Sequence, residues 1–347
     1  MTASPRLPLI CALICALAMA PAIADAAETV RWPIAWKAGE VASFDTESLV
    51  REIEAGAAQT RRITDRTDIR TVEVDDNGYA LAWITRDSRV EAVEGDRGTT
   101  DMLAPMLDEL DGFEVVIELD RSGHYRRVRN LDAVAVKLRT TMKPIFAANL
   151  LRMFNDADPK VSKYDRDAML TLAQNNLEAS LDTIITTRSV EAMSSAQAKA
   201  LSTFVGKPLV VGKRYRDAEP MDSPMEAVPL PASREYVLSL VDDDPALARI
   251  RWTHTLDPGG DAEALWTLAG ELTGKAEPGA RVEDRPADLV LQEEGVVLFR
   301  RDTGAIEMME TVEISRYGKT HDEHERYRMR RSDSARTWAQ EEAAAKR

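Results

Sequence analysis

Cysteine is nearly absent from this chain of 347 residues. Both cysteines, Cys11 and Cys15, lie within the segment Met1–Ala26, which we expect to be removed. Ile10 and Ile14 precede them, whereas a lipoprotein needs a small residue before its acylated cysteine, so we do not expect lipidation. The expected mature chain has no thiol, which excludes disulfides, thiolate catalysis and cysteine-ligated metals. Packing must therefore stabilise the fold, even in an oxidising compartment.

Signatures of common enzyme chemistry are also missing. The sequence has no Gly-x-Ser-x-Gly elbow, and no serine falls in an obvious strand-to-helix turn. Apart from Gly259-Gly260, the glycines are scattered singly, so no glycine-rich loop is available to hold a phosphate. We therefore assign no catalytic, cofactor-binding or metal-ligating residue and predict no cofactor.

No stretch of the chain reaches the roughly 20 apolar residues that a membrane-spanning helix needs. The longest apolar run, Leu7–Ala20, is shorter and follows the positive charge of Arg6. Pro21 comes next, and Ala22-Ile23-Ala24 or Ala24-Asp25-Ala26 offers the small residues that a signal peptidase requires. The N-terminal segment up to Ala26 therefore predicts a cleaved signal peptide and a periplasmic or secreted protein. An uncleaved anchor is the alternative.

Positive charge is in deficit. Lys and Arg number 45 against 59 Asp and Glu, which gives a formal charge of −14. Removal of the predicted signal peptide takes away Arg6 and Asp25, one charge of each sign, so the mature chain keeps this value. Because nucleic acids bind clustered cations, they are poor candidates as partners. With 44% hydrophobic residues, the chain can still bury a core, as two domains or one elongated one.

The sequence does contain a series of alternating segments that predict β-hairpins. Residues Ile69–Val74 alternate, Asp75–Gly78 supplies an Asn-Gly turn, and Tyr79–Ile84 predicts the return strand. The other extended segments expected in the first half are Lys37–Phe44, Phe113–Leu119 and, after a turn at Asp120–Gly123, His124–Val128.

The second half presents the same landmarks in the same order. Val241-Asp242-Asp243 resembles Val74-Asp75-Asp76, and Trp252 takes the place of Trp83 on a return strand. This order predicts an internal duplication. The alternative is that any two β-rich halves show Asp and Gly turns between apolar runs. The extended segments expected here are Val211–Tyr215, Tyr236–Leu240, Ala248–Trp252, Val296–Phe299 and Ile306–Met309.

Between the halves, the hydrophobic period changes from two to about 3.6, which is typical of helices. Apolar residues trace one helical face from Val134 to Phe154, and Asp165 is expected to cap a further helix. Ser194 or Ser195 is expected to cap a shorter helix that ends at Phe204.

The predicted fold class is α+β, with two antiparallel β-rich units, duplicated or independent, around a central helical segment. The prolines between 220 and 231 predict an extended surface loop. The charged tail is either a terminal helix or disordered. The predicted organisation is a signal peptide (1–26), an N-terminal β-rich unit (27–131), a helical segment (132–206), a C-terminal β-rich unit (207–331) and the tail (332–347).

The densest group of potential metal ligands is formed by His321, His324 and the three carboxylates between and after them. A helix would bring the two histidines to one side, whereas a strand places positions three apart on opposite faces. Alternation toward Tyr327 and Met329 favours a strand. We therefore expect a solvated edge and no metal site.

The remaining candidates have structural interpretations. His124 is followed by three arginines, which either hold an anion or, as we favour, balance nearby carboxylates. His254 lies in an alternating strand and is expected to point away from Thr253, on a half-buried sheet. The aspartate groups Asp75/Asp76 and Asp242–Asp244 are expected at solvated turns, in preference to acid–base pairs or calcium ligands.

These features resemble the uncharacterised secreted proteins of Gram-negative bacteria. The layout also looks like the lipoprotein-carrier type of periplasmic fold, in which a strongly curved antiparallel sheet wraps around helices. That resemblance implies a cavity between sheet and helices for an acyl chain or another apolar group, and it transfers no functional residue. Trp32, Trp36, Trp83 and Trp252 either line such a cavity or, as is commoner, close the core.

The leading hypothesis is a non-enzymatic periplasmic binding or envelope-associated protein, with an apolar ligand or an envelope protein as its partner. The alternatives are a structural or interaction protein of the envelope without a small-molecule ligand, and a hydrolase with an unrecognised site. A continuous apolar cavity under the helices favours the first, and an exposed apolar patch favours the second. Convergence of three or more titratable side chains in a cleft favours the third.

Overall fold

The computed structural model describes residues 28–34, 36–54, 57–95, 98–155, 171, 177, 181–182, 185–221, 230–257, 289–317 and 321–345. The predicted signal peptide lies outside these residues. So do the predicted cap Asp165 and most of the proline-rich segment after position 221.

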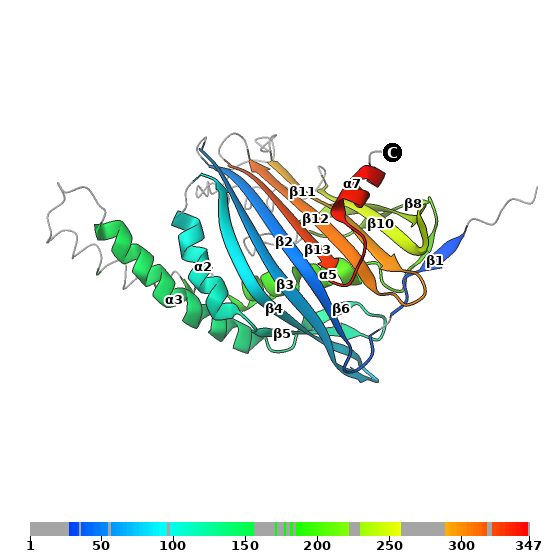
Figure 1. The fold of residues 1–347 in the computed structure, drawn as a ribbon, viewed down its shortest axis with the longest axis horizontal. Helices are drawn as coiled ribbons and strands as arrows, with labels where there is room; N and C mark the ends of the chain where they lie inside the picture. The colour runs from blue at the N-terminus through cyan, green and yellow to red at the C-terminus, as the bar shows by residue number, and fades with distance from the viewer. Residues whose placement is uncertain are drawn as a thin grey trace, which may run out of the picture.

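In the described part of the chain, one antiparallel sheet of 11 strands dominates the fold (Figure 1). Its order is β6-β5-β4-β3-β2-β13-β12-β11-β10-β9-β8. A separate two-stranded sheet pairs β1 (Thr29–Arg31) with β7 (Pro208–Val210). The strands of the large sheet are β2 (Val41–Glu54), β3 (Ala57–Asp75), β4 (Gly78–Glu94), β5 (Glu114–Asp120), β6 (Tyr125–Val128), β8 (Arg214–Ala218), β9 (Ala232–Val241), β10 (Asp244–Leu256), β11 (Leu289–Arg300), β12 (Ile306–Tyr317) and β13 (His321–Arg331).

The Asn-Gly hairpin is confirmed. Asp75 pairs with Gly78 at the end of β3 and β4, and its carboxylate accepts the amides of Asn77 at 2.7 Å and Gly78 at 3.0 Å. Hydrogen bonds from Asn77 hold the pKa of Asp75 below its ordinary value. The strands are much longer than predicted, because β3 begins at Ala57 and not near Ile69. Charged and polar residues occupy both faces of the first half of β3, so its sequence does not alternate between apolar and polar residues.

The described fold is mostly β, and its 11-stranded sheet consists of two meanders; the predicted division into two β-rich units stays a prediction. The first meander runs from β2 outward to β6, and the second runs from β8 back to β13. They join where β13 pairs with β2, from His321 opposite Glu54 to Arg331 opposite Phe44. The duplication of the two halves stays a prediction.

The helices are α2 (Gly98–Leu110), α3 (Leu131–Asn155), α5 (Thr187–Ser202) and α7 (Trp338–Ala345). The predicted cap at Ser194 or Ser195 is wrong. The cap is Thr186, whose side chain accepts the amide of Ser189 at 3.1 Å, while the Ser189 hydroxyl accepts the amide of Thr186 at 3.0 Å. Helix α2 was not predicted, because it contains Pro105 and buries no residue fully. No described helix is both long and apolar enough to span a bilayer.

Helices α5 and α7 lie on opposite faces of the sheet (Figure 1). Phe204, which follows α5, packs with its ring centroid 5.3 Å from that of Trp252. Glu341 of α7 instead accepts a hydrogen bond from Arg249 at 2.6 Å. Successive residues of a strand point to opposite faces, so Trp252 and Arg249, which are three positions apart, lie on opposite sides of β10. We call the side toward α5 the helix face and the side toward α7 the outer face.

The ion pair under α7 generates a stability prediction. The side chains of Arg249 and Glu341 are 8% and 6% exposed, and Arg336 also contacts Glu341 at 2.5 Å. Removing one partner of a buried pair typically costs about 3–5 kcal/mol, so Glu341→Ala should lower the free energy of unfolding by that order in urea denaturation. The control is Glu342→Ala, whose half-exposed carboxylate contacts Arg328 and should cost about 0–1 kcal/mol. Equal losses would show that the buried pair does not anchor α7.

Candidate functional site

An apolar cavity of about 360 Å³ lies between α5 and the helix face of the sheet. Its volume is within the range of roughly 300–1,000 Å³ that is typical of small-molecule sites. Many of the apolar side chains that line it are almost fully buried. They include Phe44, Ile69, Leu81, Leu119, Leu201 and Ile306.

Strand alternation explains why β3 and β4 present these side chains together. Ile69 and Thr71 lie two residues apart on β3, and Leu81 and Trp83 lie two apart on β4. Thr71 pairs with Leu81, and Ile69 pairs with Trp83. Directly opposite residues of an antiparallel pair share a face, so the four side chains form one patch of the cavity wall.

The segment before β2 closes one end of the cavity. Trp32 is 3% exposed, stacks on Phe299 at 4.5 Å between ring centroids, and donates its indole N–H to the Gly304 carbonyl at 2.9 Å. Gly304 has a φ of +72°, and a Cβ atom there would lie 2.1 Å from the carbonyl oxygen of Pro33. Glycine is therefore required where this segment crosses the β11–β12 turn.

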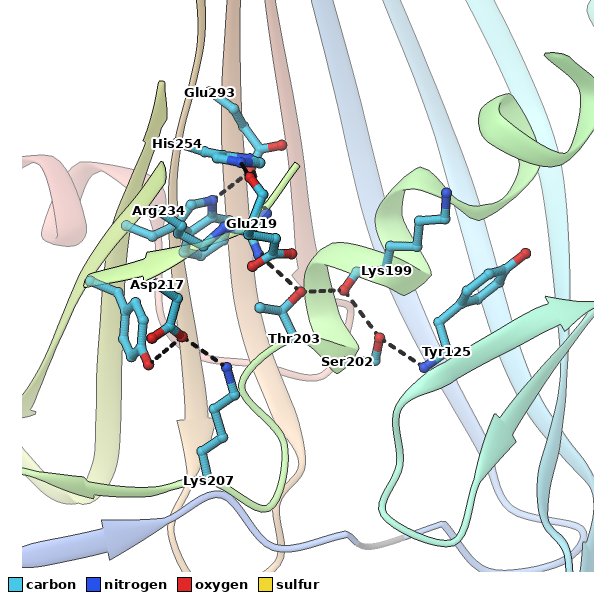
Figure 2. Close-up of polar contacts among 12 residues, drawn as sticks. Tyr125, Lys199, Ser202, Thr203, Lys207, Asp217, Glu219, Arg234, His254 and Glu293 are labelled. Carbon is cyan, nitrogen blue, oxygen red and sulfur yellow. Dashed lines mark hydrogen bonds and ion pairs between the residues drawn. The ribbon is translucent and has the colours of Figure 1, made fainter. Parts of the chain in front are cut away.

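Opposite edges of the sheet approach the end of α5 (Figure 2). The Ser202 hydroxyl accepts the amide of Tyr125, at the start of β6, at 3.2 Å. The next residue, Thr203, accepts a hydrogen bond at 3.3 Å from Arg234 of β9, near the other edge. Because neighbouring residues contact strands so far apart in the sheet order, the sheet must curl around this end of the helix. The hydroxyl of Tyr125 also donates to Glu191 of α5 at 2.7 Å.

His254 is part of the same network, and both of its ring nitrogens are engaged. Its side chain is buried, and Arg234 donates to Nδ1 at 3.2 Å, because a guanidinium has no acceptor. Nε2 must then donate to the Glu219 carbonyl at 2.8 Å, while Arg234 pairs with the Glu219 carboxylate at 2.6 Å. These contacts link β9 and β10 to Glu219, which follows β8. Because both ring nitrogens are engaged, neither is available to act as a base.

The arginines after His124 balance carboxylates, as the structural interpretation predicted. Arg127 and Arg129 contact Glu118 at 2.7 and 2.6 Å. These hydrogen bonds lower the pKa of Glu118 to about 2. Asp243 similarly pairs with Arg336 at 3.0 Å. These groups stabilise turns and strand edges and do not converge on the cavity.

The two histidine positions near the C-terminus fall on opposite faces of one strand. Positions 321 and 324 lie on β13, where a spacing of three changes face. His324 contacts Asp322 at 3.1 Å, and Arg316 approaches the same carboxylate at 3.3 Å. Across the described ranges, no group of three or more His, Cys, Asp or Glu residues is arranged to hold a metal ion.

Sequence reasoning identified the tryptophans but not their separate roles. Trp32, Trp36 and Trp83 line the cavity, whereas Trp252 packs in the core beside Phe204. The aliphatic lining was expected only as part of strands and helices. Alternation predicts which side chains are buried, but it does not predict where opposing layers fail to fill the space between them.

A row of carboxylates crosses the helix face beyond the cavity, and no sequence pattern indicated it. Glu293 lies opposite Glu313, which lies opposite Glu325, so three acidic side chains from β11, β12 and β13 are adjacent. The side chain of Glu313 is accessible to solvent, and carboxylates of the two neighbouring strands flank it. Partial loss of hydration by burial, followed by repulsion from Glu325, Glu293 and Glu323, raises its pKa to about 7.

This row generates a prediction for the pH dependence of stability. A carboxyl whose pKa rises from 4.5 in the unfolded chain to about 7 in the folded protein destabilises the folded state as pH rises through that window. Glu313→Gln should therefore raise the thermal midpoint at pH 8 and change it much less at pH 5. The control Glu294→Gln removes a carboxylate from the outer face of β11. A rise in the thermal midpoint of Glu313→Gln that is equal at pH 5 and pH 8 would contradict the raised pKa of Glu313.

Comparisons with known proteins identify no family for the chain. No family model matches it, and no curated protein matches it. Among solved structures, the chain is distantly similar to one described as "lipid-protein interactions in lipovitellin", with a TM-score of 0.43 and 6% sequence identity. The match covers 87% of this chain and 26% of that chain, so the protein spans about a quarter of the length of the structure that it resembles.

Proposed function

We propose that this protein is a non-enzymatic binding protein that holds an apolar small molecule in the cavity between α5 and the sheet. The observation that carries the proposal is the polarity of the cavity. Its walls are buried aliphatic and aromatic side chains, while Lys37, Glu40 and Asp302, which also border it, are exposed to solvent. Charge is therefore confined to the opening, as expected for a site that removes an apolar group from water.

The energetics favour occupancy. An unfilled apolar cavity loses the dispersion contacts that its lining atoms would otherwise make. A ligand that fills it restores those contacts and stabilises the folded state through linkage. Binding should therefore raise the thermal midpoint of the protein.

The two alternative hypotheses have less support. For an enzyme, the buried histidine His254 has both nitrogens engaged, and the charged groups beside the cavity lie at its opening. For an interaction protein, the exposed large apolar side chains of the described residues should form a patch. Val41, Val72 and Val74 lie on the adjacent strands β2 and β3, but the other three are spread over β4, α3 and α5, namely Val93, Val136 and Met193.

We place this function in the periplasm or outside the cell, because the segment Met1–Ala26 has the pattern of a signal peptide. Intact mass measurement of the exported protein should show cleavage after Ala24 or after Ala26. Ala24 belongs to both candidate sites, so Ala24→Arg should leave the full-length precursor in the membrane fraction. Recovery of the wild-type protein in the cytoplasmic fraction with its leader intact would contradict the placement.

Blocking the cavity tests the binding proposal. Ala198 lies on α5, is 5% exposed and borders the cavity, so Ala198→Phe places a ring in the space that the ligand needs. This variant should lose binding of the neutral apolar dye N-phenylnaphthylamine, measured by fluorescence titration, and should retain its circular dichroism spectrum. The matched control is Met193→Phe, at a position on the same helix that is 58% exposed, and it should bind the dye like the wild type.

Native mass spectrometry of protein from its own envelope fraction provides the second test. A co-purifying apolar molecule that is absent from Ala198→Phe would support the proposal. Equal dye binding by the wild type and Ala198→Phe would refute the cavity as the site. A wild-type protein that binds no dye and carries no ligand would favour the interaction hypothesis.

A further inference from the structure

Two buried hydrogen-bonding groups in the cavity wall have no partner among the described residues. Thr71 and Trp83 both line the cavity, and neither the Thr71 hydroxyl nor the Trp83 indole N–H makes a hydrogen bond within this part of the chain. Thr71 is 1% exposed, and the indole nitrogen of Trp83 is buried although the ring is partly exposed. Leaving such groups without a partner is unfavourable, which indicates that something outside the described residues satisfies them.

Comparable groups on the helix face are satisfied within the protein. The Thr67 hydroxyl donates to the Asp65 carboxylate at 3.1 Å, on the same strand as Thr71. The indole N–H of Trp32 donates to the Gly304 carbonyl at 2.9 Å, and that of Trp252 donates to Glu293 at 2.5 Å. Four other buried side-chain atoms of the described residues also lack a partner, Ser195 Oγ and Arg234 Nε among them, but only those of Thr71 and Trp83 belong to the cavity wall.

The positions of the two groups favour one shared acceptor. Thr71 lies opposite Leu81, and Trp83 lies opposite Ile69, so Thr71 and Trp83 are diagonal neighbours on one face of two adjacent strands. An indole N–H can only donate, and a hydroxyl can donate, so one ligand oxygen can satisfy both groups. The rest of this patch is aliphatic, and a ligand here needs a single polar atom on an otherwise apolar body.

The charges around the cavity indicate that this atom is neutral. The lining cations are Lys37, which is exposed, and Arg331, which is half-exposed and paired with Asp333 at 2.7 Å. A carboxylate buried against Thr71 and Trp83 would lose its hydration without gaining a buried cation. We infer that the ligand is an acyl ester or amide whose chain fills the cavity and whose carbonyl oxygen accepts hydrogen bonds from Thr71 and Trp83. This inference rests on the proposed function.

The test compares two probes and two variants. Methyl decanoate supplies a neutral carbonyl, and tridecane has the same number of heavy atoms without one. Affinities are measured by displacement of N-phenylnaphthylamine from the wild type, Thr71→Val and Trp83→Phe. Because a neutral hydrogen bond is worth about 1 kcal/mol, each substitution should weaken methyl decanoate binding by roughly three- to tenfold and leave tridecane binding unchanged.

The outcomes separate this inference from the proposal on which it rests. If neither probe displaces the dye from the wild type, the proposed function fails. If both bind and the two variants weaken both equally or neither, the carbonyl assignment fails while the apolar site stands. If the variants weaken free decanoate more than its methyl ester at pH 8, the groups hold a carboxylate and the neutral assignment is overturned, since charged acceptors form the stronger hydrogen bonds.

The stability of the ligand-free protein gives an independent readout. Thr71→Val removes an unpaired hydroxyl and keeps the shape of the side chain, so the thermal midpoint should stay the same or rise. The control is Thr67→Val, which is also buried on β3 but loses the hydrogen bond to Asp65, so its midpoint should fall. A fall of equal size in both variants would show that the Thr71 hydroxyl is already satisfied, which overturns the inference.

Discussion

The pairing of β2 with β13 is the interaction on which the rest of the structure depends. It joins the first long strand of the sheet to the last strand of the chain, from His321 opposite Glu54 to Arg331 opposite Phe44. Without it, the chain would form two independent meanders, each with an additional exposed edge. With it, the described strands form one sheet, and strand twist accumulates across its whole width.

A sheet that curls in this way has an apolar inner face that other parts of the chain must cover. The chain provides α5, whose last residue, Ser202, contacts β6 while Thr203 contacts β9. It also provides the segment around Trp32, which stacks on Phe299. These two covers meet the sheet at its ends and leave a space against β3 and β4. The cavity lies where α5 and this extended segment do not completely fill the space against the inner face of the sheet.

Local signals predicted local structure. The Asn77-Gly78 turn and the Asp120–Gly123 turn were recognisable because their backbone requirements restrict the residues that can occupy them. The long first half of β3 was missed because charged residues such as Arg61 and Arg62 interrupt its alternation, although ion pairs with Glu52 and Glu91 accommodate them on the sheet. The contact between β2 and β13 joins distant parts of the chain, and no local pattern encodes it.

The candidate site was also predictable only where a local pattern or a general layout indicates it. A cavity between sheet and helices followed from the resemblance in layout, and the tryptophans were recognised as residues that can line one. The unsatisfied groups of Thr71 and Trp83 could not be recognised, because a hydrogen bond that is not made is visible only when all neighbours are in place. The carboxylate row from Glu293 to Glu325 likewise depends on the register of three strands.

The most direct measurement of the central claim is a crystal structure of the ligand-free protein under xenon pressure. Xenon enters apolar cavities that water leaves empty. We expect anomalous density between α5 and the helix face, in contact with Phe44, Ile69 and Leu81. Ordered water throughout this space, or side chains that close it completely, would contradict the claim that the sheet is built around an apolar ligand.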